Sequence, residues 1–214
     1  GGTVEAEVVS LAEQANEKAQ AALDATVTML GNYDIVCAAS DTPTELKKYA
    51  KYICRGDDAR PELQSAIYEA MNLGVKVKLL PGNYVLNSRA EVEGATVNCA
   101  LWFPNDKPAA EIYIKTNNVF HSFEGVVLPI GYNSGACIQM GTGLFTNIGS
   151  NESFSLFACG GGQIYGRGLC VKNLSISLPS NSKPIVIING QTSFLIDFEN
   201  LFVSGCDVQS VDYT

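Results

Sequence analysis

Two copies of one short pattern, 27 residues apart, constrain the fold of this chain more than any other feature. The first copy is Val-Lys-Asn-Leu-Ser-Ile-Ser at 171–177, and the second is Phe-Glu-Asn-Leu-Phe-Val-Ser at 198–204. A shorter match links Ala-Cys at 136–137 to Ala-Cys at 158–159, a spacing of 22 residues. Unequal repeats of this length are typical of a solenoid, whose coils share one core but differ in loop length. The repeat therefore predicts an all-β chain folded as a right-handed parallel β-helix.

The asparagine shared by the two copies predicts a specific contact between coils. In-register stacking places like residues above one another at the strand spacing of ~4.8 Å. Asn173 and Asn200 would then form a structural amide ladder at an inward bend, each side chain bonding its neighbour and adjacent backbone. A ligand site built on the same two amides is the alternative.

From residue 75 onward the chain alternates short β-prone runs with turn residues. A strand is expected over 75–80, the turn Pro81-Gly82-Asn83 follows, and the next strand begins at 84–86. Corners rich in Asn, Gly and Ser separate the later runs, and no long helical pattern lies between them. This texture excludes a doubly wound α/β sheet, whereas an antiparallel sandwich or barrel is an alternative to the solenoid.

The N-terminal segment 3–30 lacks Gly and Pro and is rich in Ala, Glu and Gln, which favours a helix. Its apolar residues recur at alternating steps of four and three, with Lys18 as one polar exception: Val4, Val8, Leu11, Ala15, Ala22, Ala25 and Met29. This heptad spacing predicts a helical stem, a possible coiled coil, over residues 1–32. Its apolar seam needs burial, because an isolated helix is marginal in water. Two partners fit the seam: the same helix of other chains, or the chain's own domain.

Two further helices are expected before the β-region. One spans about 43–54 and has Asp41 or Thr42 as its cap. The other spans about 60–73, and Gly74 ends it.

The turn Arg55-Gly56-Asp57-Asp58 separates these two helices. Its first three residues also occur in adhesion motifs, but a tight turn before a helix explains them more simply. The helices make up a helical cap region over residues 33–74. The parallel β-helix is assigned to residues 75–214, and we expect it to continue beyond Thr214.

The composition excludes several classes of function. A net charge of −8 argues against a protein that tracks the phosphates of nucleic acid. The seven cysteines are scattered and form no Cys-x-x-Cys pair. They fit buried thiols in a chain assembled in a reducing cytoplasm better than a disulfide framework or a zinc site. No run approaches the ~18 apolar residues of a membrane span, and no motif indicates a metal or another cofactor.

Few residues suggest catalysis or ligand binding. Glycoside hydrolysis needs two carboxylates on a rigid face, and Asp197 and Glu199 lie two apart in an expected strand, on one face. Glu199, however, aligns with Lys172 of the preceding repeat, which favours a solvent-facing ion pair between coils. The single histidine, His121, excludes a multi-histidine metal site within one chain and is expected at the surface or an interface. Trp102 is the candidate for an exposed ring that stacks on carbohydrate.

Part of the chain resembles a known family. The turn at 56–58 followed by Leu63-Gln64-Ser65-Ala66-Ile67 is similar to the Gly-Asp turn and Leu-Gln-x-Ala-Ile helix of pectate-lyase-like right-handed β-helices. The likeness is greatest to the branch of phage tail spikes and prophage tail proteins. Residues 74–86, a strand leading into Pro81-Gly82-Asn83-Tyr84, resemble the first coil of that family. The resemblance implies that the helix at 60–73 caps the open end of the solenoid.

The resemblance also implies a function. It predicts a tail- or cell-surface-associated structural and receptor-binding protein, a homotrimer found on a virion tail or outside the cell. Its expected partner is a surface polysaccharide or another receptor. The first alternative is a polysaccharide-degrading enzyme, a lyase or glycoside hydrolase whose active site lies largely beyond residue 214. The second alternative is a secreted bacterial β-helix adhesin.

Overall fold

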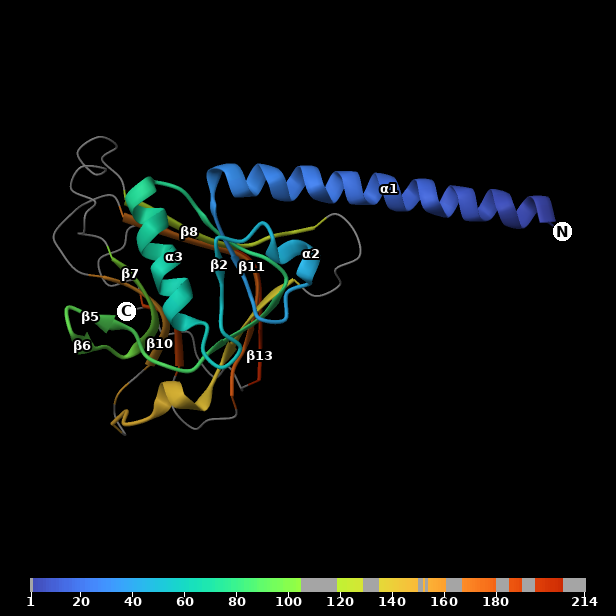
Figure 1. The fold of residues 1–214 in the computed structure, drawn as a ribbon. Helices are drawn as coiled ribbons and strands as arrows, with labels where there is room; N and C mark the ends of the chain where they lie inside the picture. Colours follow the sequence, from blue (N-terminus) through green and yellow to red (C-terminus); the bar gives the residue numbers. More distant parts are fainter. Residues whose placement is uncertain are drawn as a thin grey trace.

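The computed structural model of this 214-residue chain is mostly β-structure with few helices (Figure 1). A large parallel sheet curls into a half-barrel and does not close within the described residues. The prediction of a mainly parallel β-fold is thereby confirmed at this coarser level. The structure describes residues 2–104, 119–128, 135–149, 152, 154–160, 167–179, 185–189 and 195–205.

The strands fall into three parallel groups, which the chain visits in turn. The first group contains β2 (Tyr52–Ile53), β1 (Ile35–Ala38), β3 (Val77–Leu79), β8 (Val119–Gly125) and the first parts of β11 (Arg167–Ser177) and β13 (Leu195–Ser204). The second contains β4 (Gly82–Leu86), β9 (Ala136–Met140) and the last parts of β11 and β13. The third contains β7 (Cys99–Pro104), β10 (Phe154–Gly160) and β12 (Ile185–Asn189). A small antiparallel hairpin, β5 (Glu91–Val92) with β6 (Ala95–Thr96), lies apart from them.

The parallel register stacks like side chains into columns, and two of these columns build the core. In the first group the register aligns Ile35, Val77, Phe123, Val171 and Phe198. In the second group it aligns Tyr84, Ile138, Ile176 and Val203. The first four residues of the one column and the first three of the other are buried in a single apolar cluster, to which strands from all three groups contribute. Because strand side chains alternate, the intervening positions face outward.

Helix α3 (Arg60–Leu73) confirms the helix predicted over about 60–73. Gly74 ends it with a left-handed φ of 67°, a conformation that glycine adopts without strain. The apolar face of α3 packs into the main core through Leu63, Ala66, Ile67 and Ala70. Gln64, on the same face of α3, forms two hydrogen bonds to the backbone of Trp102. Its Nε2 donates to Trp102 O at 2.7 Å, and its Oε1 accepts from Trp102 N–H at 2.9 Å. One side chain thus satisfies both backbone groups of a residue in β7.

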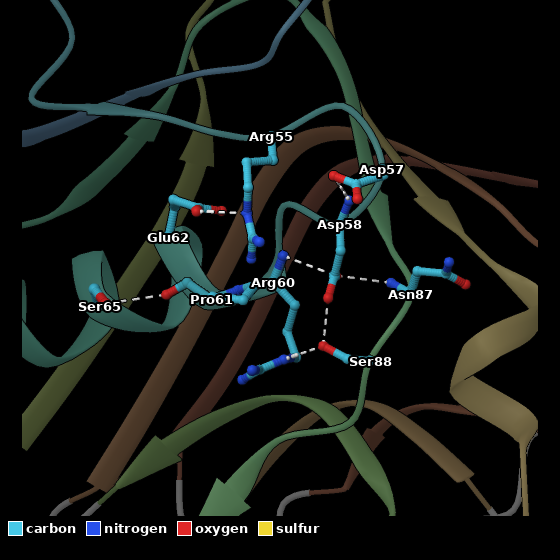
Figure 2. A network of polar contacts seen from close by, with 9 residues as sticks. All are labelled: Arg55, Asp57, Asp58, Arg60, Pro61, Glu62, Ser65, Asn87 and Ser88. Atoms are coloured by element: carbon cyan, nitrogen blue, oxygen red, sulfur yellow. Dashed lines mark hydrogen bonds and ion pairs between the residues drawn. The ribbon is translucent and has the colours of Figure 1, made fainter.

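Asp58 fixes the start of α3 to the end of β4 (Figure 2). Its Oδ1 accepts hydrogen bonds from the backbone N–H of Arg60 at 3.2 Å and of Asn87 at 2.9 Å. Its Oδ2 accepts from the hydroxyl of Ser88, which in turn accepts from Arg60 Nε at 2.7 Å. Asp58 precedes the N-cap residue Ala59, and its carboxylate joins the first residue of α3 to the segment that follows β4.

The Arg-Gly-Asp tripeptide at 55–57 is engaged in the same turn (Figure 2). Arg55 Nε pairs with Glu62 Oε1 at 3.0 Å, and Asp57 Oδ1 accepts from the Asp58 N–H at 3.1 Å. A Cβ on Gly56 would lie 2.8 Å from Ser40 Oγ, so a larger residue there would require the Ser40 hydroxyl to move. These contacts fit a structural turn.

The helix expected over about 43–54 is wrong in its length, since α2 (Thr44–Lys47) ends early. Strand β2 occupies part of the remaining stretch. The backbone N–H groups of Lys51 and Cys54 donate to carbonyl oxygens of β1 at 2.8 Å each. Pairing with an existing strand therefore outweighs the helical spacing of the apolar residues.

Asp41 and Thr42, expected as caps of that helix, instead fasten the chain to the turn before β4. Thr42 Oγ1 donates to Pro81 O at 2.8 Å, and Asp41 accepts from the Asn83 backbone N–H at 2.8 Å. Gly82 is required between them, because its φ is 152° and a Cβ there would meet Asp41 Oδ1 at 2.8 Å.

Helix α1 (Gly2–Tyr33) extends away from the body of the protein, with the N-terminus at its far end (Figure 1). Of its described side chains, residues 2–25, only Leu23 is buried. Leu23 packs in a small apolar cluster with Val36, Leu46 and Leu80. The helix is thus anchored close to its C-terminal end.

Candidate functional site

The corner between the first and second strand groups is formed by asparagines in a left-handed conformation. Asn173 in β11 has a φ of 56° and Asn200 in β13 has a φ of 53°. Asparagine is among the few residues that adopt this conformation readily, and it turns the strand direction there. The amide nitrogen of Asn200 donates to Asn173 Oδ1 at 3.1 Å. The two residues that the repeat aligns are therefore bonded side by side.

Glycine occupies the equivalent place one strand earlier. Gly125 follows Glu124, which is paired with Lys172, so Gly125 lies beside Asn173. A Cβ on Gly125 would stand 2.0 Å from Asn173 O, far inside any allowed contact. The missing side chain at this position lets the backbone of β11 approach.

A groove of about 240 Å³ follows this corner. Residues from five separate stretches of chain line it, and both asparagines are among them. The lining residues are Pro81, Val126, Val127, Leu128, Gly135, Ala136, Asn173, Leu174, Ser175, Asn200 and Phe202. No charged residue is among them.

Phe202 gives the groove an exposed aromatic ring. The register aligns Phe202 with Ser175 and Cys137, at outward positions of the second strand group. Its side chain is 68% exposed, whereas the neighbouring Leu201 and Val203 pack against the core. The groove lining thus combines an exposed aromatic ring at an outward position with two asparagine amides.

A ladder of alternating charges lies on the outward face of the first strand group. The register aligns Lys78, Glu124, Lys172 and Glu199 across β3, β8, β11 and β13. Lys78 forms an ion pair with Glu124, and Lys172 Nζ lies 2.8 Å from Glu199 Oε2. Opposite charges directly across parallel strands attract, so this face stabilises the register of the sheet.

Glu124 is the most deeply buried member of the ladder. Burial raises the pKa of its carboxyl. Hydrogen bonds from Lys78 and Ser122 and the charges of Lys78 and Lys76 outweigh this effect and lower the pKa to about 2. The Ser122 hydroxyl donates to Glu124 Oε1 at 2.5 Å. Glu124 is therefore a structural carboxylate held in its charged form.

The two candidate catalytic carboxylates lie together and share a cation. Lys172 Nζ is 3.4 Å from Asp197 Oδ2, in addition to its contact with Glu199. The hydrogen bond to Glu199, followed by the charge of nearby groups, raises the pKa of Lys172. This arrangement has the form of an ion pair between strands, and the Lys172 ammonium contacts both carboxylates where a substrate would have to bind.

Trp102 lies away from the groove, in the third strand group. It is half-buried and packs against a small cluster of Ala90, Cys99 and Ala158. Its backbone is bonded by Gln64 of α3. The structure thus places Trp102 where α3 meets β7, apart from the two asparagines.

The expectation that His121 lies at the surface or at an interface is wrong, because its side chain is only 4% exposed. His121 is at an inward position of β8, and its Nε2 lies 2.7 Å from Pro104 O. Its ring packs edge-on against Phe103, with centroids 5.4 Å apart. Burial lowers the pKa of His121 to about 4, although the bond to Pro104 raises it. The imidazole is a neutral core group.

The described cysteines carry no disulfide, and burial raises the pKa of Cys54 and of Cys99 to about 12. They are thus poor nucleophiles. Within the part of the chain that the structure describes, no cluster of three or more His, Cys, Asp or Glu side chains is arranged to hold a metal ion. None of the described helices is long and apolar enough to cross a membrane.

Sequence reasoning found the two asparagines but missed the groove and Phe202. The groove depends on residues 126–128, which no repeat links to the corner. A weak signal for the charge ladder existed, since a charged residue precedes the bend in Glu124-Gly125, Lys172-Asn173 and Glu199-Asn200. Comparisons with protein-family models, with curated proteins and with solved structures found no match to this chain.

Proposed function

We propose that the chain is the capped start of a right-handed parallel β-helix in a tail- or cell-surface-associated protein, and that its corner groove binds neutral surface carbohydrate. The fold proposal is supported by the three parallel strand groups that the chain visits in turn. Connections between parallel strands of one sheet are right-handed in about 98% of cases. Helix α3 packs on the core at the early strands, as an end cap would.

The observation that carries the carbohydrate proposal is the exposed ring of Phe202 beside the amides of Asn173 and Asn200. A sugar ring has an apolar C–H face that stacks on an aromatic ring, and hydroxyl groups that both donate and accept hydrogen bonds. An asparagine amide has two N–H donors and one carbonyl acceptor. Among the described residues, the hydrogen bond between the two asparagines uses one donor and one acceptor, and other amide groups are left for ligand hydroxyls.

The charges of the protein favour a neutral glycan. The groove has no charged residue in its lining, and the chain as a whole carries a net charge of −8. An acidic polysaccharide would find no cation in the groove to pair with and would be repelled by the overall field. We therefore expect neutral polymers to bind in preference to uronate-rich ones.

A binding panel tests the proposal. Purified neutral and acidic bacterial surface polysaccharides are titrated into the full chain by isothermal calorimetry. Phe202→Ala should weaken binding of the neutral polymers by roughly tenfold or more, since burial of a large apolar side chain contributes about 1.5–3 kcal/mol. Leu73→Ala is the matched control, because Leu73 is 61% exposed on α3 and absent from the groove lining.

The same panel separates binding from degradation. Bound polymer that is recovered intact supports a display protein. Release of reducing ends or unsaturated products by the wild type, with loss of this activity in Asp197→Asn or Glu199→Gln, would instead show that the chain is a polysaccharide-degrading enzyme. If no polymer binds, the carbohydrate proposal fails.

A further inference from the structure

Among the described side chains of α1, residues 2–25, those that attach the helix to the body lie on one side. Leu23 is 7% exposed in its apolar cluster, and Asp24 Oδ1 accepts a hydrogen bond from the Tyr49 hydroxyl at 2.9 Å. Successive residues of an α-helix are about 100° apart around its axis. The middle of the attached side therefore lies between Leu23 and Asp24, and the opposite side carries residues 22 and 25.

The side opposite the attachment is the apolar seam. Ala22 and Ala25 belong to the heptad series that begins with Val4, Val8 and Leu11, and all of them are exposed. Val4 and Leu11 are each 65% exposed and Val8 is 60% exposed. The body thus holds the helix so that residues 4–25 of its apolar seam face away from the part of the domain that the structure describes.

The projecting part of α1 needs a partner for its stability. Residues 2–22 form about 30 Å of helix, at ~1.5 Å per residue, beyond the attachment at Leu23 (Figure 1). Such a segment is marginal in water when it buries nothing. Apolar residues at alternating steps of four and three, here Val4, Val8 and Leu11 followed mainly by alanines, fit a helix with the same spacing.

We propose that this seam joins copies of the chain in a parallel helical bundle. The charges flanking the seam favour this occupant. In a parallel in-register pair Glu7 of one copy faces Ala12 of the other, and Gln14 faces Ala19, so like charges do not meet at these flanking positions. Lys18 of every copy then lies at one level of the seam, where it weakens the bundle and fixes its register.

Sedimentation of the full chain over a range of concentrations tests the bundle. The wild type should reach two or more times the monomer mass of 22.8 kDa. Val8→Glu should raise the dissociation constant at least about tenfold, because it removes a buried valine from each copy. Val9→Glu is the matched control: Val9 is 56% exposed, directly adjacent, and points away from the seam. Lys18→Leu should strengthen association.

Cross-linking tests the parallel alignment. With Val4→Cys, mild oxidation should join two copies at residue 4, whereas the wild type under the same treatment should not cross-link. An antiparallel bundle would leave those cysteines at opposite ends. A wild type that stays monomeric at every concentration, or equal effects of Val8→Glu and Val9→Glu, would overturn the proposal. The result is independent of carbohydrate binding, which each monomer can be tested for separately.

Discussion

The paired hydrogen bonds of Gln64 predict a large loss of stability when this side chain is removed. Gln64→Ala leaves both the N–H and the C=O of Trp102 without their partners. Gln64 is only 6% exposed, so water reaches these groups poorly once α3 is in place. A buried backbone group without a partner costs about 1–3 kcal/mol. We expect the free energy of unfolding to fall by about 2–5 kcal/mol.

Gln64→Glu gives a sharper test, because it keeps the acceptor and changes only the donor. At neutral pH the carboxylate still accepts from the Trp102 N–H, but its second oxygen opposes the Trp102 carbonyl. Burial raises the pKa of such a carboxyl above the value of about 4.3 that it has in the unfolded chain. The protonated form can donate to Trp102 O. The ionisation penalty should therefore be full at neutral pH, shrink as the pH falls through the raised pKa of the folded state, and be absent below about 4.

Trp102 also provides the assay, since it is the only tryptophan of the chain. Urea unfolding followed by its fluorescence, at several pH values, gives the free energy of each variant. Asn72→Ala, at an exposed position of α3, controls for changes in helix propensity. If the free energies of unfolding of Gln64→Ala and Asn72→Ala agree within about 0.5 kcal/mol, the two hydrogen bonds between Gln64 and Trp102 do not stabilise the fold, and the prediction is refuted.

Three further predictions concern the corner and the charge ladder. Because the pKa of Glu124 lies near 2, below its ordinary 4.5, its stabilisation is present above pH 4.5 and lost as the pH falls toward 2; Glu124→Gln should flatten this acid dependence of urea unfolding. Gly125→Ala should destabilise by more than about 3 kcal/mol in thermal unfolding, whereas Gly135→Ala, with nothing within 4 Å of the added Cβ, should be nearly neutral. Asn200→Ala should lower the melting temperature more than Asn200→Gly, because alanine adds about 1–2 kcal/mol of left-handed strain to the loss of the bond with Asn173. Equal melting temperatures for the two Asn200 variants would contradict the role of the left-handed bend.

Local patterns in the sequence were informative where short-range physics decides the structure. The apolar spacing and Gly74 gave α3 with its correct bounds, because a helix and its cap are local features. The 27-residue repeat placed Asn173 and Asn200 in register, because parallel stacking aligns like residues. A turn was also expected before α3, and residues 55–58 form one, but its hydrogen bonds from Asp58 were not predicted.

The rest depends on contacts between residues far apart in the chain. The apolar spacing predicts a helix over residues 51–54. Part of this stretch is a strand instead, because it pairs with β1. The side chain of His121 points into the core because it lies two residues before Phe123 in β8, on the same face of the strand. The sequence around His121 does not show which face of the strand is buried. The groove needs Val126–Leu128 beside Phe202, a contact across more than one strand that no local spacing encodes. The groove and the position of His121 were therefore not predictable, because both depend on pairing between strands that are distant in the sequence.

The bend at Asn173 has a consequence for how this protein can vary. In β11 the chain passes from Lys172 to Leu174 through one residue, whereas the corresponding passage in the preceding layer runs from Glu124 to Ala136. Both passages rejoin the same ladders, so segment length at this corner is uncoupled from strand register. Val126, Val127 and Leu128 line the groove. A change in the length of the segment at this corner can therefore alter the groove while the strands keep their register.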